Sequence, residues 1–356
     1  MASMNMAMKK AANHNLSTGT HTSSSVSYPY SFGLTFVFVI LIVAQSLATE
    51  RSLKSSHLAY SPWHAICLSE VMKLTVNVIY ASFLLVRARG SNVLVADKHV
   101  LAQLLIRYIL PALGYTAANA LGLFAVDAAG ATGALVAGQM RLPTTAAIWQ
   151  VVMGKRMSMA HWTCIVGTVT CCISYELLRR LAPGSKANNH LWRLYVPTLL
   201  GSVASAIAGA SNERLLKRFS SGKRAHSSIH NACLCANAAL AALAMSHFAE
   251  PAPDVRWNAL LEPPTALAVA LHAAVGICVS VILKDLSLPH KAIAGTLAAP
   301  TSVAFGYVVF GKPFPDAPRA AALLGVAICS CTFHALPMPT DDRSAPRNAE
   351  DEKKLR

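Results

Sequence analysis

The chain has 356 residues, of which 54% are hydrophobic and only 13% are charged. This composition excludes an ordinary soluble domain, in which about a quarter of the residues carry a charge. The formal net charge is +15, which in a membrane protein reflects Lys- and Arg-rich cytosolic loops more often than nucleic-acid binding, so we expect no nucleic-acid partner.

In chain order, residues 1–30 are rich in Ser, Thr, Asn and His. We interpret them as a disordered cytosolic tail rather than a signal peptide, because no short cleavable apolar core comes first. Residues 31–336 hold ten apolar runs of a length that can cross a bilayer as a helix, and residues 337–356 form a second cytosolic tail. The ten runs are 31–49, 64–86, 105–126, 130–153, 160–178, 194–212, 227–248, 266–284, 291–311 and 317–336. The predicted fold is an all-α membrane protein with ten transmembrane helices.

The distribution of basic residues orients these helices. If the N-terminus is cytosolic, most of the 31 Lys and Arg residues fall on the cytosolic side, including Lys155-Arg156 and the cluster from Arg214 to Arg224. The bias is imperfect, because Arg179 and Arg193 fall on the opposite side. The positive-inside rule therefore predicts that both termini face the cytosol.

A repeat divides the chain into two halves. Pro143-Thr144-Thr145 is followed by Val151-Val152-Met153-Gly154-Lys155, and 157 residues later Pro300-Thr301-Ser302 is followed by Val308-Val309-Phe310-Gly311-Lys312. The fourth and ninth runs are thus equivalent, and each half has five runs. Because five is odd, the second half must be inverted relative to the first, a pattern typical of alternating-access transporters. The repeats are about 31–178 and 194–336.

The fourth run contains a charge near its middle, Arg141. A charge at that depth costs about 2.5–3.5 kcal/mol on insertion scales and is usually functional. Pro143 frees backbone groups in the same run, which must find other partners. We interpret residues 138–145 as half of an anion site. The alternative is an internal ion pair of Arg141 with Asp127 or Glu213.

Other polar residues in the runs give weaker signals. Glu70 and Lys73 lie three residues apart on one helix face and are predicted to form an ion pair, either structural or gating. The nine cysteines lie in apolar runs, where we expect packing thiols. The histidines show no ligand spacing, so we predict no metal site and no cofactor.

Four segments together resemble one family. They are Leu68-Ser69-Glu70-Val71-Met72-Lys73, Gln139-Met140-Arg141-Leu142-Pro143-Thr144-Thr145, Asn212-Glu213-Arg214-Leu215-Leu216-Lys217, and Ile282-Leu283-Lys284 followed by Lys291. Their order and spacing over roughly residues 30–335 resemble the nucleotide-sugar transporters of the CMP-sialic acid/UDP-galactose type, within the drug/metabolite transporter superfamily.

The resemblance implies ten helices, cytosolic termini, residence in the Golgi or endoplasmic reticulum membrane, and exchange of a cytosolic nucleotide sugar for a lumenal nucleoside monophosphate. It also implies a central nucleotide pocket, in which Arg141 and Lys291 would clamp phosphate between the halves. Transport makes and breaks no bond, so we expect no enzyme activity. The residues carried over to the pocket are Tyr115, Asn119, Arg141, Thr145, Asn231, Ser280 and Lys291.

The sequence departs from the family pattern at three places. Arg141 stands where the family has a lysine, Ala118-Asn119-Ala120 stands for Gln-Asn-Asn, and Gly138 replaces a tyrosine. Arginine keeps the charge and offers phosphate a bidentate fork. The base and the sugar stay open, with Pro143 leaning toward the CMP-sialic acid branch.

Lys353 and Lys354, fourth and third from the end, resemble a di-lysine retrieval signal that binds coat protein on a cytosolic tail; the alternative is a solvated charged tail.

Two other functions stay open: another drug/metabolite transporter (for purines, amino acids or organic phosphates), and a membrane-embedded transferase, for which only Asp127 and Asp316 lie in the relevant loops. A homodimer is also left open.

Overall fold

The structure, a computed structural model, describes residues 28–55, 61–87, 98–181, 191–220, 227–249, 257–311 and 314–336. All regular elements in these ranges are helical, so the predicted all-α class is confirmed. Most of the two predicted tails, with Lys353 and Lys354, lies outside the described residues.

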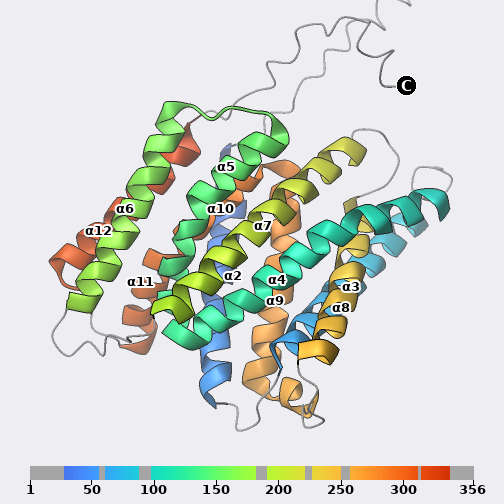
Figure 1. Ribbon diagram of the computed structural model, residues 1–356, viewed down its shortest axis with the longest axis horizontal. Helices are drawn as coiled ribbons and strands as arrows, with labels where there is room; N and C mark the ends of the chain where they lie inside the picture. The colour runs from blue at the N-terminus through green and yellow to red at the C-terminus, as the bar shows by residue number, and fades with distance from the viewer. Residues whose placement is uncertain are drawn as a thin grey trace, which may run out of the picture.

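The helices form one bundle (Figure 1). In the figure, α2 begins and α12 ends at the same end of this bundle, whereas α2 and α7 end at opposite ends. The α-helices are α2 (Tyr28–Ser55), α3 (Pro62–Arg87), α4 (Lys98–Ala137), α5 (Arg141–Met153), α6 (Met159–Leu181), α7 (Leu191–Ser220), α8 (Ser227–Ala249), α9 (Pro263–Asp285), α10 (Leu288–Thr296), α11 (Ala298–Phe310) and α12 (Ala317–Ala335), with 3-10 turns η1 (Gly138–Met140) and η2 (Trp257–Leu261).

Seven of the described helices are long and apolar enough to cross a membrane: α2, α3, α4, α7, α8, α9 and α12. The protein is therefore a multi-pass membrane protein. The predicted runs 130–153, 160–178 and 291–311 are not among the seven, so length and composition alone do not establish ten spans. The first and last of these three runs are each divided into shorter helices, and α6 covers the second.

The run 130–153 is divided at η1 (Gly138–Met140) and the run 291–311 at Leu297, in both cases just ahead of the proline. Gly130 has φ 70° and ψ 174° inside α4, a backbone conformation that favours glycine, and it separates residues 131–137 from the rest of that helix. Pro143 and Pro300 each occupy the third position of a new helix, α5 and α11. The first four N–H groups of a helix have no intrahelical partner, so these prolines cost the helices no hydrogen bond and begin them rather than kink them.

The sequence repeat has a structural counterpart. The helices α5 and α11 both have 13 residues, and their ends are separated by the same 157 positions as the repeat. Each ends on a glycine in the left-handed conformation, Gly154 with φ 67° and Gly311 with φ 60°, as is common at helix C-termini. The repeated Val-Val-x-Gly thus encodes the end of a helix in each half.

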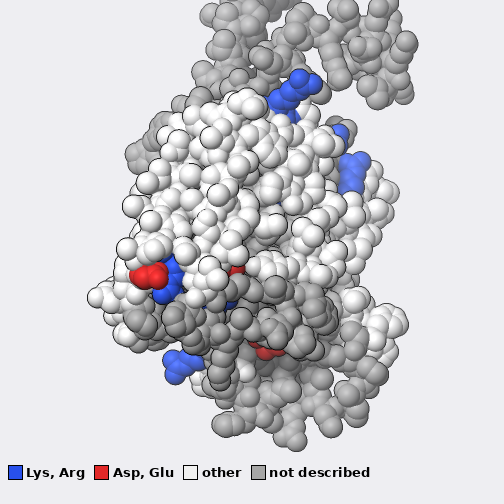
Figure 2. Space-filling view, turned by 60° about the vertical axis from the view of Figure 1, so that its left-hand side comes forward, with Lys and Arg blue, Asp and Glu red and all other residues white. Residues whose placement is uncertain are grey.

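The outside of the bundle is apolar. Large side chains such as Val151, Phe248 and Val308 are more than three-quarters exposed, whereas Glu70 and Glu213 are buried. On the face shown in Figure 2, a broad uncharged band separates the few charged side chains in view. Such a surface suits contact with lipid, because the apolar side chains face outward and the two glutamates lie inside the bundle.

Candidate functional site

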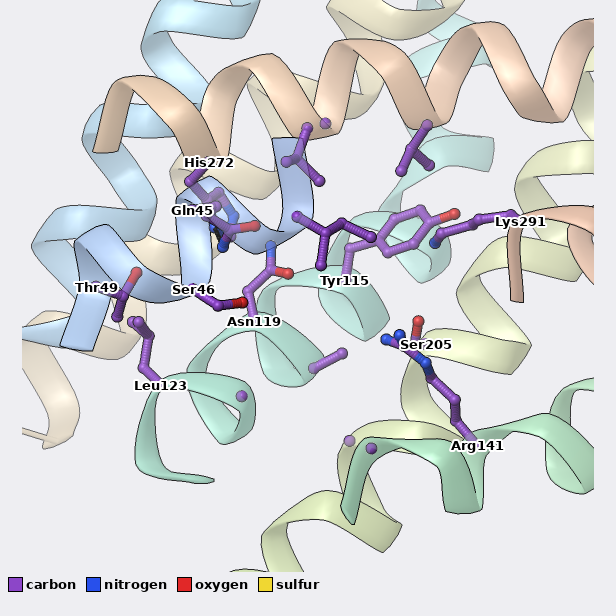
Figure 3. Close-up of a pocket in the computed structure, with 18 of the residues that line it drawn as sticks. Gln45, Ser46, Thr49, Tyr115, Asn119, Leu123, Arg141, Ser205, His272 and Lys291 are labelled. Atoms are coloured by element: carbon purple, nitrogen blue, oxygen red, sulfur yellow. Dashed lines mark hydrogen bonds between the residues drawn. The ribbon is translucent and has the colours of Figure 1, made fainter. Parts of the chain in front are cut away.

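A cavity of about 290 Å³ lies inside the bundle. Its lining comes from both sequence halves, on the helices α2, α3, α4, α5, α7, α8, α9 and α10. Figure 3 shows Arg141 and Lys291 toward one end of the cavity, with Ser205 and Tyr115 beside them, and Gln45, Ser46, Thr49, Asn119 and His272 toward the other. This volume is near the lower end of the range typical of small-molecule sites, about 300–1,000 Å³.

Arg141 and Lys291 lie at one end of the cavity (Figure 3). Arg141 is the first residue of α5 and Lys291 belongs to α10, so each half supplies one cation on a broken helix. The Nζ atom of Lys291 lies 5.3 Å from the ring centroid of Tyr115, within reach of a cation–π attraction.

Neither cation has a carboxylate partner among the described residues. The Nε atom of Arg141 is buried there without a hydrogen-bond partner. Asp127 is exposed, and Glu213 bonds to Trp149, Leu288 and Lys217 instead. The internal ion pair that the sequence left open is therefore not formed in the described part of the chain, and an anion in the cavity would supply what Arg141 lacks.

The position of Arg141 depends on a glycine opposite it. A Cβ atom built on Gly295 of α10 would lie 2.7 Å from Nη2 of Arg141, closer than such contacts allow. Because Gly295 has no side chain, the guanidinium of Arg141 has room to lie against α10.

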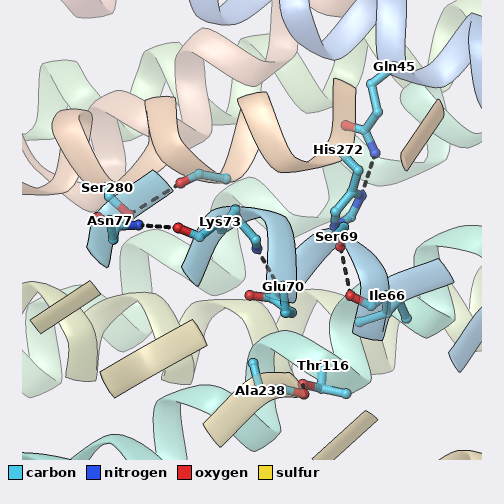
Figure 4. Close-up of polar contacts among 11 residues, drawn as sticks. Gln45, Ile66, Ser69, Glu70, Lys73, Asn77, Thr116, Ala238, His272 and Ser280 are labelled. Atoms are coloured by element: carbon cyan, nitrogen blue, oxygen red, sulfur yellow. Dashed lines mark hydrogen bonds and ion pairs between the residues drawn. The ribbon is translucent and has the colours of Figure 1, made fainter. Parts of the chain in front are cut away.

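Glu70 and Lys73 form an ion pair on α3 that also lines the cavity (Figure 4). Both residues are buried, with 2% and 8% exposed. Lys73 passes close to α9, because a Cβ built on Gly276 would lie 2.6 Å from its Cδ atom. The pair adds no net charge to the cavity, so the net positive charge of its lining comes from Arg141 and Lys291.

Away from Arg141 and Lys291 the cavity is polar and carries no net charge. Gln45, Ser46 and Thr49 of α2 face Asn119 of α4 and His272 of α9 there (Figure 3). The amide Nε2 of Gln45 lies 2.9 Å from Nδ1 of His272 and donates to it. These groups offer several hydrogen-bond donors and acceptors to a hydroxyl-rich ligand.

Part of this lining was predicted from the sequence. Of the seven carried-over residues, five line the cavity: Tyr115, Asn119, Arg141, Ser280 and Lys291. Among the described lining residues Thr145 and Asn231 do not appear; Thr145 is buried in α5, and Asn231 lies on α8. The hydroxyl of Ser280 donates to the carbonyl of Gly276 at 3.2 Å within its own helix.

Gln45, Ser46, Thr49 and His272 also line the cavity and were not predicted from the sequence. A signal existed for the first three, because positions 45, 46 and 49 share one face of a helix in an otherwise apolar run. Polar residues on one face of a spanning helix point to the bundle interior. No comparable pattern surrounds His272.

An all-helical, multi-pass bundle that encloses a cationic cavity, lined by residues from both parts of the chain, has the features of a membrane transporter. The family model described as "Nucleotide-sugar transporter" matches residues 30–328. The chain therefore belongs to the nucleotide-sugar transporter family.

Solved structures share this fold. One, described only as "Crystal structure of protein", is similar with a TM-score of 0.55 and 20% sequence identity, over 86% of this chain and 98% of that one. A search of curated proteins finds no match.

Proposed function

We propose that the protein is an antiporter, which exchanges a cytosolic nucleotide sugar for a lumenal nucleoside monophosphate in the Golgi or endoplasmic reticulum membrane, with both termini cytosolic. One observation carries the proposal: Arg141 and Lys291, from opposite halves, enter one cavity without a carboxylate partner among the described residues. Phosphate is the ligand that such a pair suits, because Arg binds it bidentately and Lys as a point charge.

Alternating access by two inverted halves of five spans is part of the proposal. The packing of the described helices supports it. If each span of the first half corresponds to its counterpart in the second, the contact of α2 with α9 becomes that of α7 with α4, and both contacts are made. The helices α3 and α8, and α6 and α12, each pack against their own counterpart. This pattern fits a twofold axis that relates the halves, with α10 and α11 together as the ninth span.

The end of the cavity away from Arg141 and Lys291 indicates which kind of sugar the protein would bind. Among the described lining residues, the cations are Lys73, Arg141 and Lys291, and Lys73 is already paired with Glu70. Gln45 and His272 suit hydroxyl groups rather than a carboxylate. These features favour a nucleoside diphosphate linked to a neutral sugar, such as UDP-galactose, over an acidic sugar such as CMP-sialic acid.

A thermal-shift screen of the purified protein against CMP, UMP, GMP and AMP, followed by UDP-galactose and CMP-sialic acid, tests the function. A ligand that binds the folded state raises its melting temperature by mass action. We expect a shift with one nucleotide and its sugar conjugate, and counterflow of the same pair in proteoliposomes. No shift with any nucleotide would contradict the proposal and favour another drug/metabolite transporter.

Gly295→Ala is expected to weaken nucleotide binding by roughly tenfold, because the new methyl group must displace the Arg141 guanidinium and its charge-assisted hydrogen bonds. The dissociation constant measured by calorimetry checks this. Gly33→Ala is the matched control, since nothing lies within 4 Å of a Cβ built there. Equal affinities of the two variants would contradict the placement of Arg141.

Lys353→Ser with Lys354→Ser is expected to move the protein from the endoplasmic reticulum to the Golgi, if the two lysines act as a retrieval signal on a cytosolic tail. Both residues lie outside the described part of the chain. Microscopy of the tagged protein against markers of both compartments measures the result, with Arg356→Ser as the control. An unchanged location would contradict the retrieval role.

A further inference from the structure

Two glutamates hold the two broken spans at equivalent points. The Oε2 atom of Glu50, near the end of α2, accepts a hydrogen bond of 2.9 Å from the backbone N–H of Ala131. The Oε2 atom of Glu213, on α7, accepts one of 2.8 Å from the N–H of Leu288. Ala131 is the first residue after the Gly130 break and Leu288 is the first residue of α10. These two positions are separated by the 157 residues of the repeat.

The bonds have a clear physical basis. The first N–H groups of a helix have no partner within it, and inside a membrane no bulk water replaces that partner. A carboxylate at the start of a helix satisfies such a group and is favoured by the helix dipole. The two glutamates themselves are not separated by 157 positions, so comparison of the two halves by sequence does not reveal them.

Each held segment leads to one of the two cavity cations. The segment that Glu50 holds runs through residues 131–140 into Arg141, and the helix that Glu213 holds contains Lys291 three residues after Leu288. The carboxylates therefore fix the helix starts that position the cations in the cavity.

Other side chains also contact the two carboxylates or lie beside them. Trp149 Nε1 of α5 donates to Glu213 at 3.0 Å, and Lys217 Nζ bonds to it at 2.5 Å. Glu50 lines a second cavity of about 160 Å³ together with Tyr175 and the ion-paired Glu176 and Arg179 of α6. Each glutamate thus links its own helix to the start of a broken span and lies near further charged side chains.

The two points lie at opposite ends of the bundle, since α2 and α7 end on opposite sides in Figure 1. We propose that Glu50 and Glu213 are positioning residues that each close one mouth of the cavity, by holding the broken helix at that mouth, and that releasing one bond opens only its own side. The inference rests on the proposed alternating access. A purely structural role would lower stability without preference for a side.

The test measures access to the cavity from each side of the membrane. Ser205→Cys places a thiol in the cavity lining, in the full-length protein in sealed vesicles and in vesicles turned inside out. A membrane-impermeant methanethiosulfonate is added, and modification of residue 205 is followed by peptide mass spectrometry. Glu50→Ala and Glu213→Ala are compared with Glu262→Ala, because Glu262 precedes α9 without making a side-chain hydrogen bond to it.

We expect Glu50→Ala to raise the labelling rate about fivefold or more from one side, and Glu213→Ala to do so from the other. Glu→Gln at either position keeps an acceptor oxygen and should label like the parent. If an alanine variant does not fold, Glu→Asp keeps the charge but shortens its reach, and should give the same sided increase. Increases from the same side, or rates equal to those of Glu262→Ala, would overturn the inference.

The result is independent of the substrate, because labelling requires no nucleotide. Sided labelling in a protein that no nucleotide stabilises would reject the proposed function and leave the role of the two glutamates in place. Labelling without a preferred side, in a protein that binds a nucleotide, would reject the role of the two glutamates and leave the proposed function in place.

Discussion

Arg141→Ala is expected to abolish the melting-temperature shift caused by nucleotide and to reduce exchange in proteoliposomes by about 10- to 100-fold. A hydrogen bond to a charged group contributes about 1.5–3 kcal/mol, and Arg141 supplies the bidentate group of the proposed clamp. Arg141→Lys should retain part of the binding, because it keeps the charge but loses the fork.

The same substitution should not lower the stability of the empty protein. Arg141 has no carboxylate partner among the described residues, and its Nε is buried without a hydrogen bond, so its removal relieves an uncompensated charge. We therefore expect an equal or higher melting temperature without ligand. Unchanged nucleotide affinity would contradict the clamp, and a large drop in the melting temperature without ligand would show that Arg141 has a structural partner instead.

Lys73→Met or Glu70→Gln alone is expected to destabilise the protein by about 3–5 kcal/mol, because each leaves one buried charge without its partner. The double variant removes both charges and should recover most of that loss. A double-mutant cycle on the melting transition measures the coupling between the two side chains. Additive losses would contradict the ion pair as a stabilising unit.

Exchange measurements on the same variants separate the two roles that the sequence left open for this pair. If the pair is structural, the double variant recovers transport together with stability. If it gates the cavity, which both residues line, stability returns but transport does not. Arg319, which pairs with the exposed Asp316, provides the control: Arg319→Met should cost much less, since surface pairs contribute about 0–1 kcal/mol.

The helical class and the repeat were accessible from the sequence. Apolar runs of bilayer length specify helices regardless of their neighbours, because every backbone group inside a membrane must bond within its own segment. The repeat of Pro143–Lys155 at Pro300–Lys312 located two equivalent helices, and α5 and α11 match in length and in their C-terminal glycines. Arg141 was also recognisable from the sequence, because a charge within an apolar run is costly and is usually functional.

The prolines at 143 and 300 indicated kinks, and the two runs divide into shorter helices just ahead of them, at η1 (Gly138–Met140) and at Leu297. The interruptions at Gly130 and ahead of Leu288 lie at the starts of the same runs. The partners that make these breaks tolerable, Glu50 and Glu213, come from other helices. Such long-range compensation leaves no local pattern in the sequence.

Composition, periodicity and the cost of a buried charge are local properties, so the sequence alone indicated a helical, multi-pass membrane protein with a repeated segment and a charge within an apolar run. Tertiary structure alone decided which side chains reach the cavity. It brought Gln45 and His272 in and left Thr145 and Asn231 out of the described lining, because each residue turns a helix face by about 100° and only packing against other helices sets that rotation. It also joined Arg141 of the first half to Gly295 of the second, and Glu213 to Leu288 within the second half, and no single segment encodes these contacts.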